Sequence, residues 1–371
     1  MAQPVRSVVM SWTGAAPIAA AVALVLALFW GGTLPVVVVV VLSVLLAAAV
    51  LAAVYHAEVV AHRVGEPFGS LILAVAVTAI EVGLIITLMI GGGEGATSLA
   101  RDTVFAAVMI TCNGIAGLCL LVGSLRRGVA VFNPRGVSAT LATVATLTTL
   151  SLVFPRFTTT EAGPEFSTSQ LTYAAVASLV LYGLYVGVQT IRHREYFLPV
   201  TREGDVFDPR EEDEQPEQPA TRSALASLGL LLVALVAVVG NAKLISPAVG
   251  AGVEAAGLPH SVVGVVIALL VLMPETLAAV RAAARDRIQT SLNLAYGSAM
   301  ASIGLTIPAI AVASIWLPGP LVLGLEATEM VLLGLTVVVG ILTVARGRAI
   351  PLHGTVQLTV CGAFLLFAAS P

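Results

Sequence analysis

Residues 262–280, VVGVVIALLVLMPETLAAV, form an apolar run of membrane-spanning length that contains one full charge, Glu275, preceded by Pro274. A carboxylate at the centre of a membrane helix costs about 2.5–3.5 kcal/mol on insertion scales, so such a residue is rarely kept without a use. Proline has no backbone N–H, and the carbonyl of Leu270, four residues earlier, therefore loses its helical partner. A freed carbonyl beside a carboxylate predicts a binding site for a cation or a proton.

A second run, residues 67–90, carries the same arrangement in the first half of the chain. It contains a single acid, Glu81, and Thr78 lies one helical turn before it. We therefore expect Glu81 and Glu275 to be functional, with Thr78 and the Leu270 carbonyl as additional oxygen ligands. The alternative is that each glutamate is structural and hydrogen bonds to a neighbouring helix, which is less favoured for two acids placed alike.

The composition is that of a membrane protein. Of the 371 residues, 58% are hydrophobic and 11% are charged, and the mean hydropathy is +1.00. These values lie far outside the range of soluble globular proteins and predict an all-α polytopic membrane protein. Since a helix needs about 20 apolar residues to cross the bilayer, eleven transmembrane helices are predicted, at residues 15–30, 35–55, 67–90, 103–123, 137–153, 171–190, 223–239, 261–281, 292–316, 321–345 and 352–368.

The basic residues predict the orientation of these helices, because cytoplasmic loops are enriched in Lys and Arg. With the N-terminus in the cytoplasm and eleven crossings, the inside receives fifteen basic residues and the outside only Arg101, Arg156 and Lys243. The C-terminus is then external. The expected partners are the lipid bilayer, small cations and protons; no nucleic acid and no cofactor is predicted, and the oligomeric state is left open.

The two acid-bearing runs are five crossings apart, so they must run in opposite directions through the membrane. Inverted repeats with a binding site near the midplane are the architecture of many secondary transporters. We predict an extra N-terminal helix in residues 1–31, a first five-helix repeat in 32–195, an acidic cytoplasmic linker in 196–222 and a second, inverted five-helix repeat in 223–371.

The linker is the most polar part of the chain. Residues 201–220 contain eight acids, three prolines and almost no apolar side chain, which is typical of a disordered segment. One interpretation is a solvated tether between the repeats, and another is a low-affinity sensor for cytoplasmic divalent cations. The spacing of the acids does not match an EF-hand loop.

If Glu81 and Glu275 meet between the repeats, they provide two hard oxygen donors and two negative charges, enough for one Ca²⁺ or for one or two monovalent cations. Calcium takes about six to eight oxygens, and the helices after each acid offer more of them: Thr111, Asn113, Asn293, Ser298 and Ser302. Without the cation, each carboxylate in this low dielectric takes up a proton readily. One site that holds either a cation or protons is sufficient for exchange.

A separate polar group lies near the cytoplasmic end of the second predicted helix: His56, Glu58, His62 and Glu66. Glu58 and His62 are four residues apart and can meet on one helix face. Because His titrates near neutral pH, the group can act as a proton relay, while ordinary interfacial and capping roles explain it equally well. The spacing is not the His-Glu-x-x-His of zinc peptidases.

Other polar residues in or beside the spans are expected to be structural. Asp102 and Asp286 each follow an Arg at a helix start, and Glu326 and Glu329 open the tenth helix, so we expect surface or capping residues. The three cysteines lie inside apolar runs and are expected to be core residues rather than disulfides or metal ligands: Cys112, Cys119 and Cys361.

Two segments resemble a known family. GEPFGSLILAVAVTAIEV (residues 65–82) and LMPETLAAVRAAARDRIQTSLNLAYGSAMASIGLTIP (residues 272–308) are similar to the two repeats of the calcium/cation antiporter superfamily, and more closely to bacterial ChaA-type cation/proton antiporters. The resemblance covers nearly the whole chain. It implies eleven spans in a bacterial inner membrane, one glutamate per repeat as the shared cation and proton site, and export of Ca²⁺, with Na⁺ or K⁺ as further substrates, against protons.

The chain departs from the wider calcium/proton exchanger pattern, which has Gly-Asn-Ala before the acid in both repeats. Here Val77-Thr78-Ala79-Ile80 precedes Glu81, and Leu272-Met273-Pro274 precedes Glu275. Fewer neutral ligands are therefore evident, and a Na⁺/H⁺ or K⁺/H⁺ antiporter with little calcium activity is the main alternative. An intramembrane enzyme or a channel is a remote one, because the chain has no His-Glu-x-x-His, Gly-x-Ser-x-Gly or P-loop motif.

Overall fold

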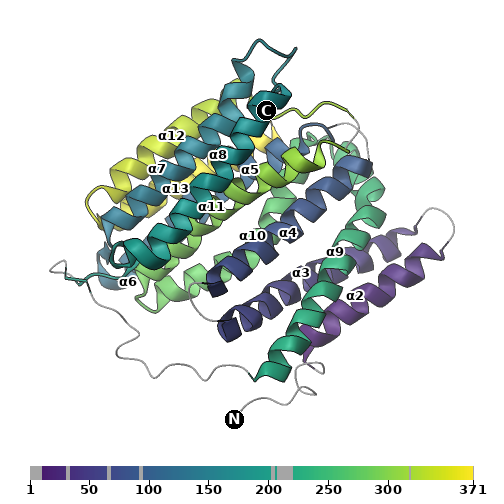
Figure 1. Cartoon of the computed structure of the whole chain (residues 1–371), viewed down its shortest axis with the longest axis horizontal. Coiled ribbons are helices and arrows are strands. Elements are labelled where there is room, and N and C mark those ends of the chain that lie inside the picture. The colour runs from purple at the N-terminus through teal and green to yellow at the C-terminus, as the bar shows by residue number, and fades with distance from the viewer. Residues whose placement is uncertain are drawn as a thin grey trace. The chain divides into compact units, whose positions relative to one another are not determined.

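The computed structural model describes residues 11–30, 34–64, 68–91, 95–201, 205–206, 220–316 and 319–370, and nearly all of them are helical (Figure 1). This confirms the predicted all-α class. Within these residues each of the eleven predicted spans corresponds to a helical segment. Ten of these segments are long and apolar enough to cross a membrane, and the exception is the shorter α2.

The bounds of the helices follow the chain in order. They are α2 (Trp12–Leu28), α3 (Val36–Val64), α4 (Phe68–Gly91), α5 (Leu99–Met109) with the π-helical turn η1 (Ile110–Ile115) and α6 (Ala116–Arg127), α7 (Pro134–Thr148) with η2 (Thr149–Val153) and η3 (Phe154–Arg156), α8 (Thr168–Gly187) with η4 (Val188–Arg192) and η5 (Arg194–Phe197), α9 (Thr221–Ala255), α10 (Ser261–Ala284), α11 (Ile288–Ala313), α12 (Ala327–Val344) and α13 (Pro351–Ala369).

Two helices extend well past their predicted ends. α3 continues to Val64 instead of residue 55, and α9 continues to Ala255 instead of residue 239. Hydropathy falls where a helix reaches the polar interface, but helix propensity does not fall with it, so an apolar window underestimates the length. As a consequence, Glu58 and His62 lie on α3, and Lys243 lies on α9 rather than in an outer loop.

The chain forms two compact units, and each draws on both halves of the sequence. The first comprises Met1–Ala96 and Gln215–Val263 and contains α2, α3, α4 and α9. In it α3 packs against each of the other three helices. A Cβ placed on Gly240 of α9 would collide with Leu24 of α2, and one on Gly83 of α4 would lie 2.7 Å from Val239. Glycine therefore permits close helix contacts here, as is common in membranes.

The second unit comprises Thr97–Glu214 and Gly264–Pro371 and contains the remaining helices, including most of α10. Its only strands among the described residues are β1 (Ala130–Val131) and β2 (Arg348–Ala349), which pair antiparallel just before α7 and α13. The three cysteines are buried and free, as predicted. Arg127 pairs with the exposed Asp286 at 3.2 Å, so Asp286 is a surface residue, as predicted.

The packing of α13 on α6 depends on Gly354. A Cβ at this position would lie 2.6 Å from both the Gly117 carbonyl oxygen and the Leu121 amide nitrogen, which are backbone atoms that cannot move aside. We expect Gly354→Ala to lower the free energy of unfolding by about 1–3 kcal/mol through overpacking, measured by denaturant titration in detergent. Gly362→Ala on the same helix is the control, because no atom lies within 4 Å of its added Cβ; equal losses in both variants would contradict the packing account.

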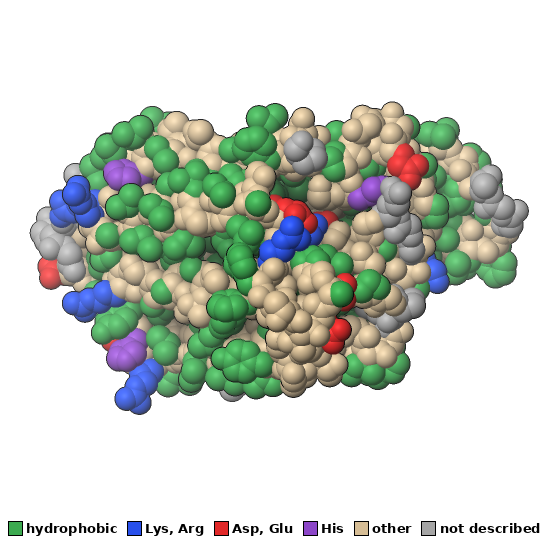
Figure 2. Space-filling model, turned by 90° about the horizontal axis from the view of Figure 1, so that it is seen from above, with side chains coloured by type: hydrophobic (Ala, Val, Ile, Leu, Met, Phe, Trp, Pro, Cys, Tyr) green, Lys and Arg blue, Asp and Glu red, His purple; other side chains and the backbone are tan. Residues whose placement is uncertain are grey.

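The outer surfaces of the helices are apolar. Large exposed side chains include Val236 on α9 and Val331 and Leu342 on α12, and Figure 2 shows many hydrophobic side chains on the face in view, with the charged ones in a few separate groups. In water such a surface would promote association, whereas in a bilayer it faces lipid. Helix length and surface composition thus agree on a polytopic membrane protein.

Candidate cation and proton site

Glu81 lies on α4 in the first unit and is buried, with 4% of its surface exposed. Thr78, one turn earlier on the same helix, is also buried. Positions three apart in a helix lie on the same face, so the Thr78 hydroxyl and the Glu81 carboxylate are presented to the same surroundings. Burial at this depth requires that the carboxylate be protonated or compensated by charge or hydrogen bonds. A site that binds either a proton or a cation has this requirement.

Glu275 lies on α10 and belongs to the second unit, together with Pro274 and the half-buried Leu270. The side chain is half-buried and its Oε2 atom is buried. The helix continues through Pro274, so the missing N–H frees the Leu270 carbonyl inside a continuous helix. The Thr276 hydroxyl donates to the Leu272 carbonyl at 2.7 Å and is thereby engaged within its own helix. The meeting of Glu81 with Glu275 stays a prediction.

Asn113 lies on η1, a π-helical turn between α5 and α6, and is 1% exposed. Its Nδ2 donates to the Thr336 hydroxyl at 2.9 Å and to the Met109 carbonyl at 3.3 Å. Both bonds use the nitrogen and hold the amide in one orientation, and they do not consume the oxygen, which is the atom that binds cations. π-Helical turns are frequent at functional sites, so the geometry is compatible with the predicted ligand role.

Asn293 is part of a different network near the start of α11. Its Nδ2 donates to the Phe197 carbonyl at 2.8 Å, and its oxygen accepts from Gln289 at 2.9 Å. Gln289 in turn accepts from the Asn133 backbone N–H at 2.7 Å. These bonds favour a structural role in joining α11 to the segments at 133 and 197. Asn293 and the half-buried Ser298 remain predicted ligands. Sequence reasoning did not single out Gln289, since nothing local marks its distant partners.

His56 faces α2 rather than the other members of the predicted relay. It is fully buried, and its Nε2 lies 3.0 Å from the Thr13 carbonyl of α2. That carbonyl has no partner within its own helix because Pro17, four residues on, has no N–H. A carbonyl only accepts, so Nε2 carries the hydrogen, and Nδ1 has no partner among the described residues. A relay needs partners on both ring nitrogens, and the contacts therefore favour a structural role.

Glu58 and His62 are close enough to interact across one turn of α3, as their spacing predicted. At about 100° per residue, His56 and Glu58 are about 200° apart around the helix, so His56 and the Glu58–His62 pair occupy different faces. Glu66 lies outside the described residues. Among the described residues the predicted relay is thus reduced to Glu58 and His62, and it stays a prediction.

We expect His56→Leu to leave the Thr13 carbonyl unsatisfied and to reduce the free energy of unfolding by about 1–3 kcal/mol. The pH profile of ion exchange should stay unchanged, because no proton passes through His56. His62→Leu is the matched control on the same helix and should leave the stability unchanged. A shifted pH profile in His56→Leu, measured in proteoliposomes, would instead support the relay.

One prediction from the sequence is wrong: Asp102 is neither a surface residue nor a simple cap. Its side chain is 4% exposed and accepts from Arg101 Nε at 2.7 Å and from the Ser98 hydroxyl at 3.0 Å. Arg101 also donates to the Gly324 carbonyl at 3.1 Å and lies 3.8 Å from Glu326. Glu326 and Glu329 do open α12 as predicted, with the Glu326 N–H donating to Glu329 at 2.8 Å.

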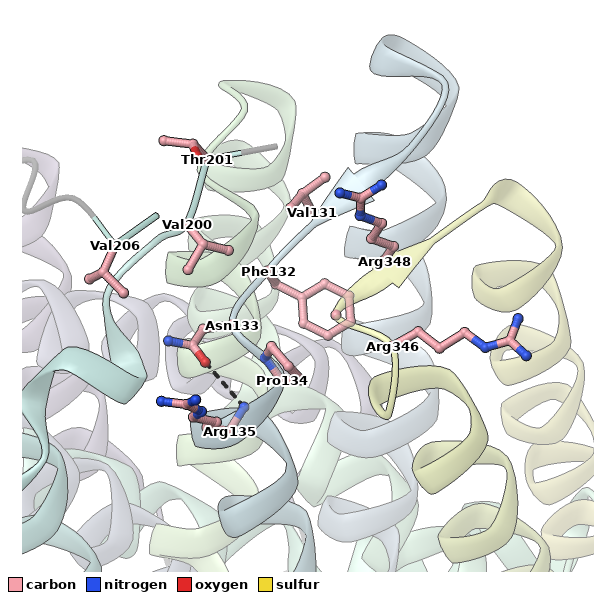
Figure 3. A pocket seen from close by; sticks show the side chains of 11 residues that line it. Val131, Phe132, Asn133, Pro134, Arg135, Val200, Thr201, Val206, Arg346 and Arg348 are labelled. Atoms are coloured by element: carbon pink, nitrogen blue, oxygen red, sulfur yellow. Dashed lines mark hydrogen bonds between the residues drawn. The ribbon is translucent and has the colours of Figure 1, made fainter. Parts of the chain in front are cut away.

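A pocket of about 290 Å³ in the second unit lies beside the paired strands. Arg135, Arg346 and Arg348 are among its lining residues, and Figure 3 shows Arg346 and Arg348 extending in different directions. No acid is among the lining residues that the structure describes. A basic lining repels cations, so this pocket is not the cation site.

The acidic linker is mostly outside the described residues. Of its acids the structure describes Asp205, whose carbonyl accepts from the Thr201 N–H at 2.8 Å. Its two interpretations, tether and cation sensor, both stay predictions.

Comparisons with known proteins agree with this architecture. The model of the sodium/calcium exchanger protein family matches residues 34–191 and 226–369, more than half of the chain. The y4hA protein of Sinorhizobium fredii (strain NBRC 101917 / NGR234) is 44% identical over 322 residues, covering 87% of this chain and 86% of that protein. The sodium-potassium/proton antiporter ChaA of Escherichia coli (strain K12) is 32% identical over 348 residues, covering 93% of each.

The solved structure of native YfkE has the same fold, with a TM-score of 0.70 at 17% identity, covering 96% of this chain and 99% of that one. The related proteins that are named for a function transport ions, which confirms that this chain is a membrane transporter of small cations and not an enzyme. The resemblance seen in the two acid-bearing segments is confirmed by full-length similarity. The chain therefore belongs to the sodium/calcium exchanger protein family.

Proposed function

We propose that the protein is a secondary antiporter that exchanges cytoplasmic cations for external protons, by alternating access at a site shared by Glu81 and Glu275. The observation that carries the proposal is that each segment matched by the family model has an acid near the middle of a membrane-length helix, Glu81 in α4 and Glu275 in α10. Acids at this depth are costly and mark ion or proton pathways in membrane proteins. The two matched ranges also lie inside the two proposed repeats, 32–195 and 223–371.

Cation and proton compete for the same carboxylate oxygens in this mechanism. With the cation bound, its positive charge compensates the two buried carboxylates; without it, protons neutralise them, since isolated buried charges are strongly unfavourable. The empty, doubly charged site is the least stable state, so the transporter rarely changes its facing direction without a ligand. This obligatory loading is what couples outward cation movement to inward proton movement in a bacterial inner membrane.

The similarity to a sodium-potassium/proton antiporter favours Na⁺ and K⁺ as the transported cations. This reverses the order of the candidate cations from the sequence analysis, in which Ca²⁺ came first. The sequences before the two acids also favour monovalent cations. They are Val-Thr-Ala-Ile and Leu-Met-Pro instead of Gly-Asn-Ala, so fewer oxygen ligands are available, and Ca²⁺ needs more of them than a monovalent ion. Calcium is the second candidate, favoured by the family's description and by the two negative charges of the site.

The test is a cation titration in proteoliposomes of purified protein, with a pH gradient monitored by a fluorescent amine. Na⁺, K⁺ and Ca²⁺ are added separately, and we expect Na⁺ or K⁺ to dissipate the gradient in a saturable way. Dissipation by Ca²⁺ alone would establish the second candidate instead. If none of the three cations dissipates the gradient, proton-coupled exchange is wrong.

A further inference from the structure

Two buried polar side chains in the second unit have no use in the transport site. Gln357 on α13 is completely buried, and Tyr296 on α11 is 1% exposed. Among the described residues, the Gln357 Nε2 and Oε1 atoms and the Tyr296 hydroxyl have no hydrogen-bond partner. A buried carboxamide with neither end satisfied is rare in folded proteins, and each such group calls for an explanation.

The packing brings these two side chains to one place. α6 contacts both α13 and α11, and all three helices belong to the second unit (Figure 1). A Cβ on Gly117 of α6 would lie 2.9 Å from Gln357 Cβ, so Gln357 lies within the close contact between α13 and α6. The Tyr296 hydroxyl lies near enough to Gln357 and to Cys112 on η1 to interact with both, but outside hydrogen-bonding geometry.

The bonding capacity of these groups exceeds what they can give each other. A glutamine carboxamide has two N–H donors and two acceptor positions, and a phenol has one donor and up to two acceptor positions. Even a direct Tyr296–Gln357 hydrogen bond would leave most of this capacity unused. The missing partner must both donate and accept, and the N–H donors exclude a cation from that side. Water has this chemistry, and buried waters typically make about three hydrogen bonds to such groups.

We propose that Tyr296 and Gln357 hold a buried water molecule that bridges α11 and α13 beside η1. The water fixes the rotation of α11 at Tyr296. The same helix carries Ser298, two residues later, and if the proposed function is right, this rotation positions that predicted ligand. Tyr296 and Gln357 are thus positioning residues, and neither is expected to touch the transported cation.

Radiolytic footprinting in ¹⁸O-labelled water tests the site without any transport measurement, because bound water generates hydroxyl radicals beside its ligands. We expect Tyr296 to be labelled several-fold faster than Phe105, an aromatic of similar burial in the same unit that packs against Phe364. In Gln357→Leu, labelling of Tyr296 should fall to the level of Phe105. Equal labelling of Tyr296 and Phe105 in the unaltered protein would overturn the proposal.

Thermal unfolding of Tyr296→Phe, Gln357→Leu and the double variant gives an independent readout. A bridging water predicts that each single change lowers the melting temperature, by about 2–4 °C, and that the double change costs little more than one of them. If the groups were simply unsatisfied, each single change would raise the melting temperature, because an unsatisfied polar group is removed; that result would overturn the proposal. Tyr173→Phe, on the exposed face of α8, should have no effect.

The consequence for α11 is measured separately. Tyr296→Phe should raise the cation concentration for half-maximal exchange several-fold while leaving the maximal rate largely unchanged. An unchanged half-maximal concentration, together with positive footprinting, would retain the water site and remove its link to the proposed function.

Discussion

Glu275→Gln and Glu81→Gln are each expected to reduce cation-driven proton exchange in proteoliposomes to the level of protein-free vesicles. Glutamine keeps the size and one oxygen of the side chain but can neither carry the negative charge that attracts a cation nor take up a proton. If both acids form one site, the loss of either removes half of its charge and all of its coupling. The effect should be equally severe for Na⁺, K⁺ and Ca²⁺, because protons are the common substrate.

Two controls separate loss of chemistry from loss of fold. Glu254→Gln replaces an exposed glutamate on α9 and should exchange at the normal rate. Glu275→Asp keeps the charge and moves it by about one methylene, so it should retain part of the activity with a weaker apparent affinity. Normal exchange by either Gln variant at 81 or 275, in protein that elutes as the unaltered chain does, would refute a shared two-glutamate site.

The arrangement of spans could be predicted from sequence because the bilayer imposes it. Any segment that crosses the hydrocarbon core must satisfy its backbone internally and present apolar side chains, so length and hydropathy together identify it. α2 is the marginal case, with 17 residues, and it is also the span that lies outside the predicted repeats. The ends of α3 and α9 were missed because polar residues at an interface lower the hydropathy without stopping the helix.

The contacts that organise the interior could not be predicted in the same way. His56 meets a carbonyl 43 positions earlier, and Asn113 meets Thr336, 223 positions later. For the His56 contact, the sequence does indicate the acceptor, since Pro17 leaves the Thr13 carbonyl without a helical partner. Nothing local indicates which donor binds it. A single Gln such as Gln357 in an apolar run has no periodicity or spacing, so its burial beside Tyr296 emerges only from the packing of α6, α11 and α13.

The buried pair of Arg101 and Asp102 has the largest expected effect on stability. Arg101 has an 11% exposed side chain, and Asp102 supplies its closest carboxylate contact, at 2.7 Å. Asp102→Ala leaves the guanidinium with the Gly324 carbonyl and with the more distant carboxylates of Glu326 and Glu329. Removing one partner of a buried ion pair costs about 3–5 kcal/mol, because the remaining charge stays desolvated and loses its closest compensating charge. Denaturant titration in detergent should show this loss.

Glu326→Gln is the comparison, because Glu326 contacts the same arginine at 3.8 Å and Arg156 at 3.3 Å but is 54% exposed. An exposed pair of this kind contributes about 0–1 kcal/mol, so the variant should be nearly as stable as the unaltered protein. The double change Arg101→Met with Asp102→Leu should recover most of the stability lost in Asp102→Ala, since apolar side chains of similar size need no compensating charge. If the double variant is as unstable as Asp102→Ala, the cost arises from lost packing or from the Ser98 contact rather than from an unpaired charge.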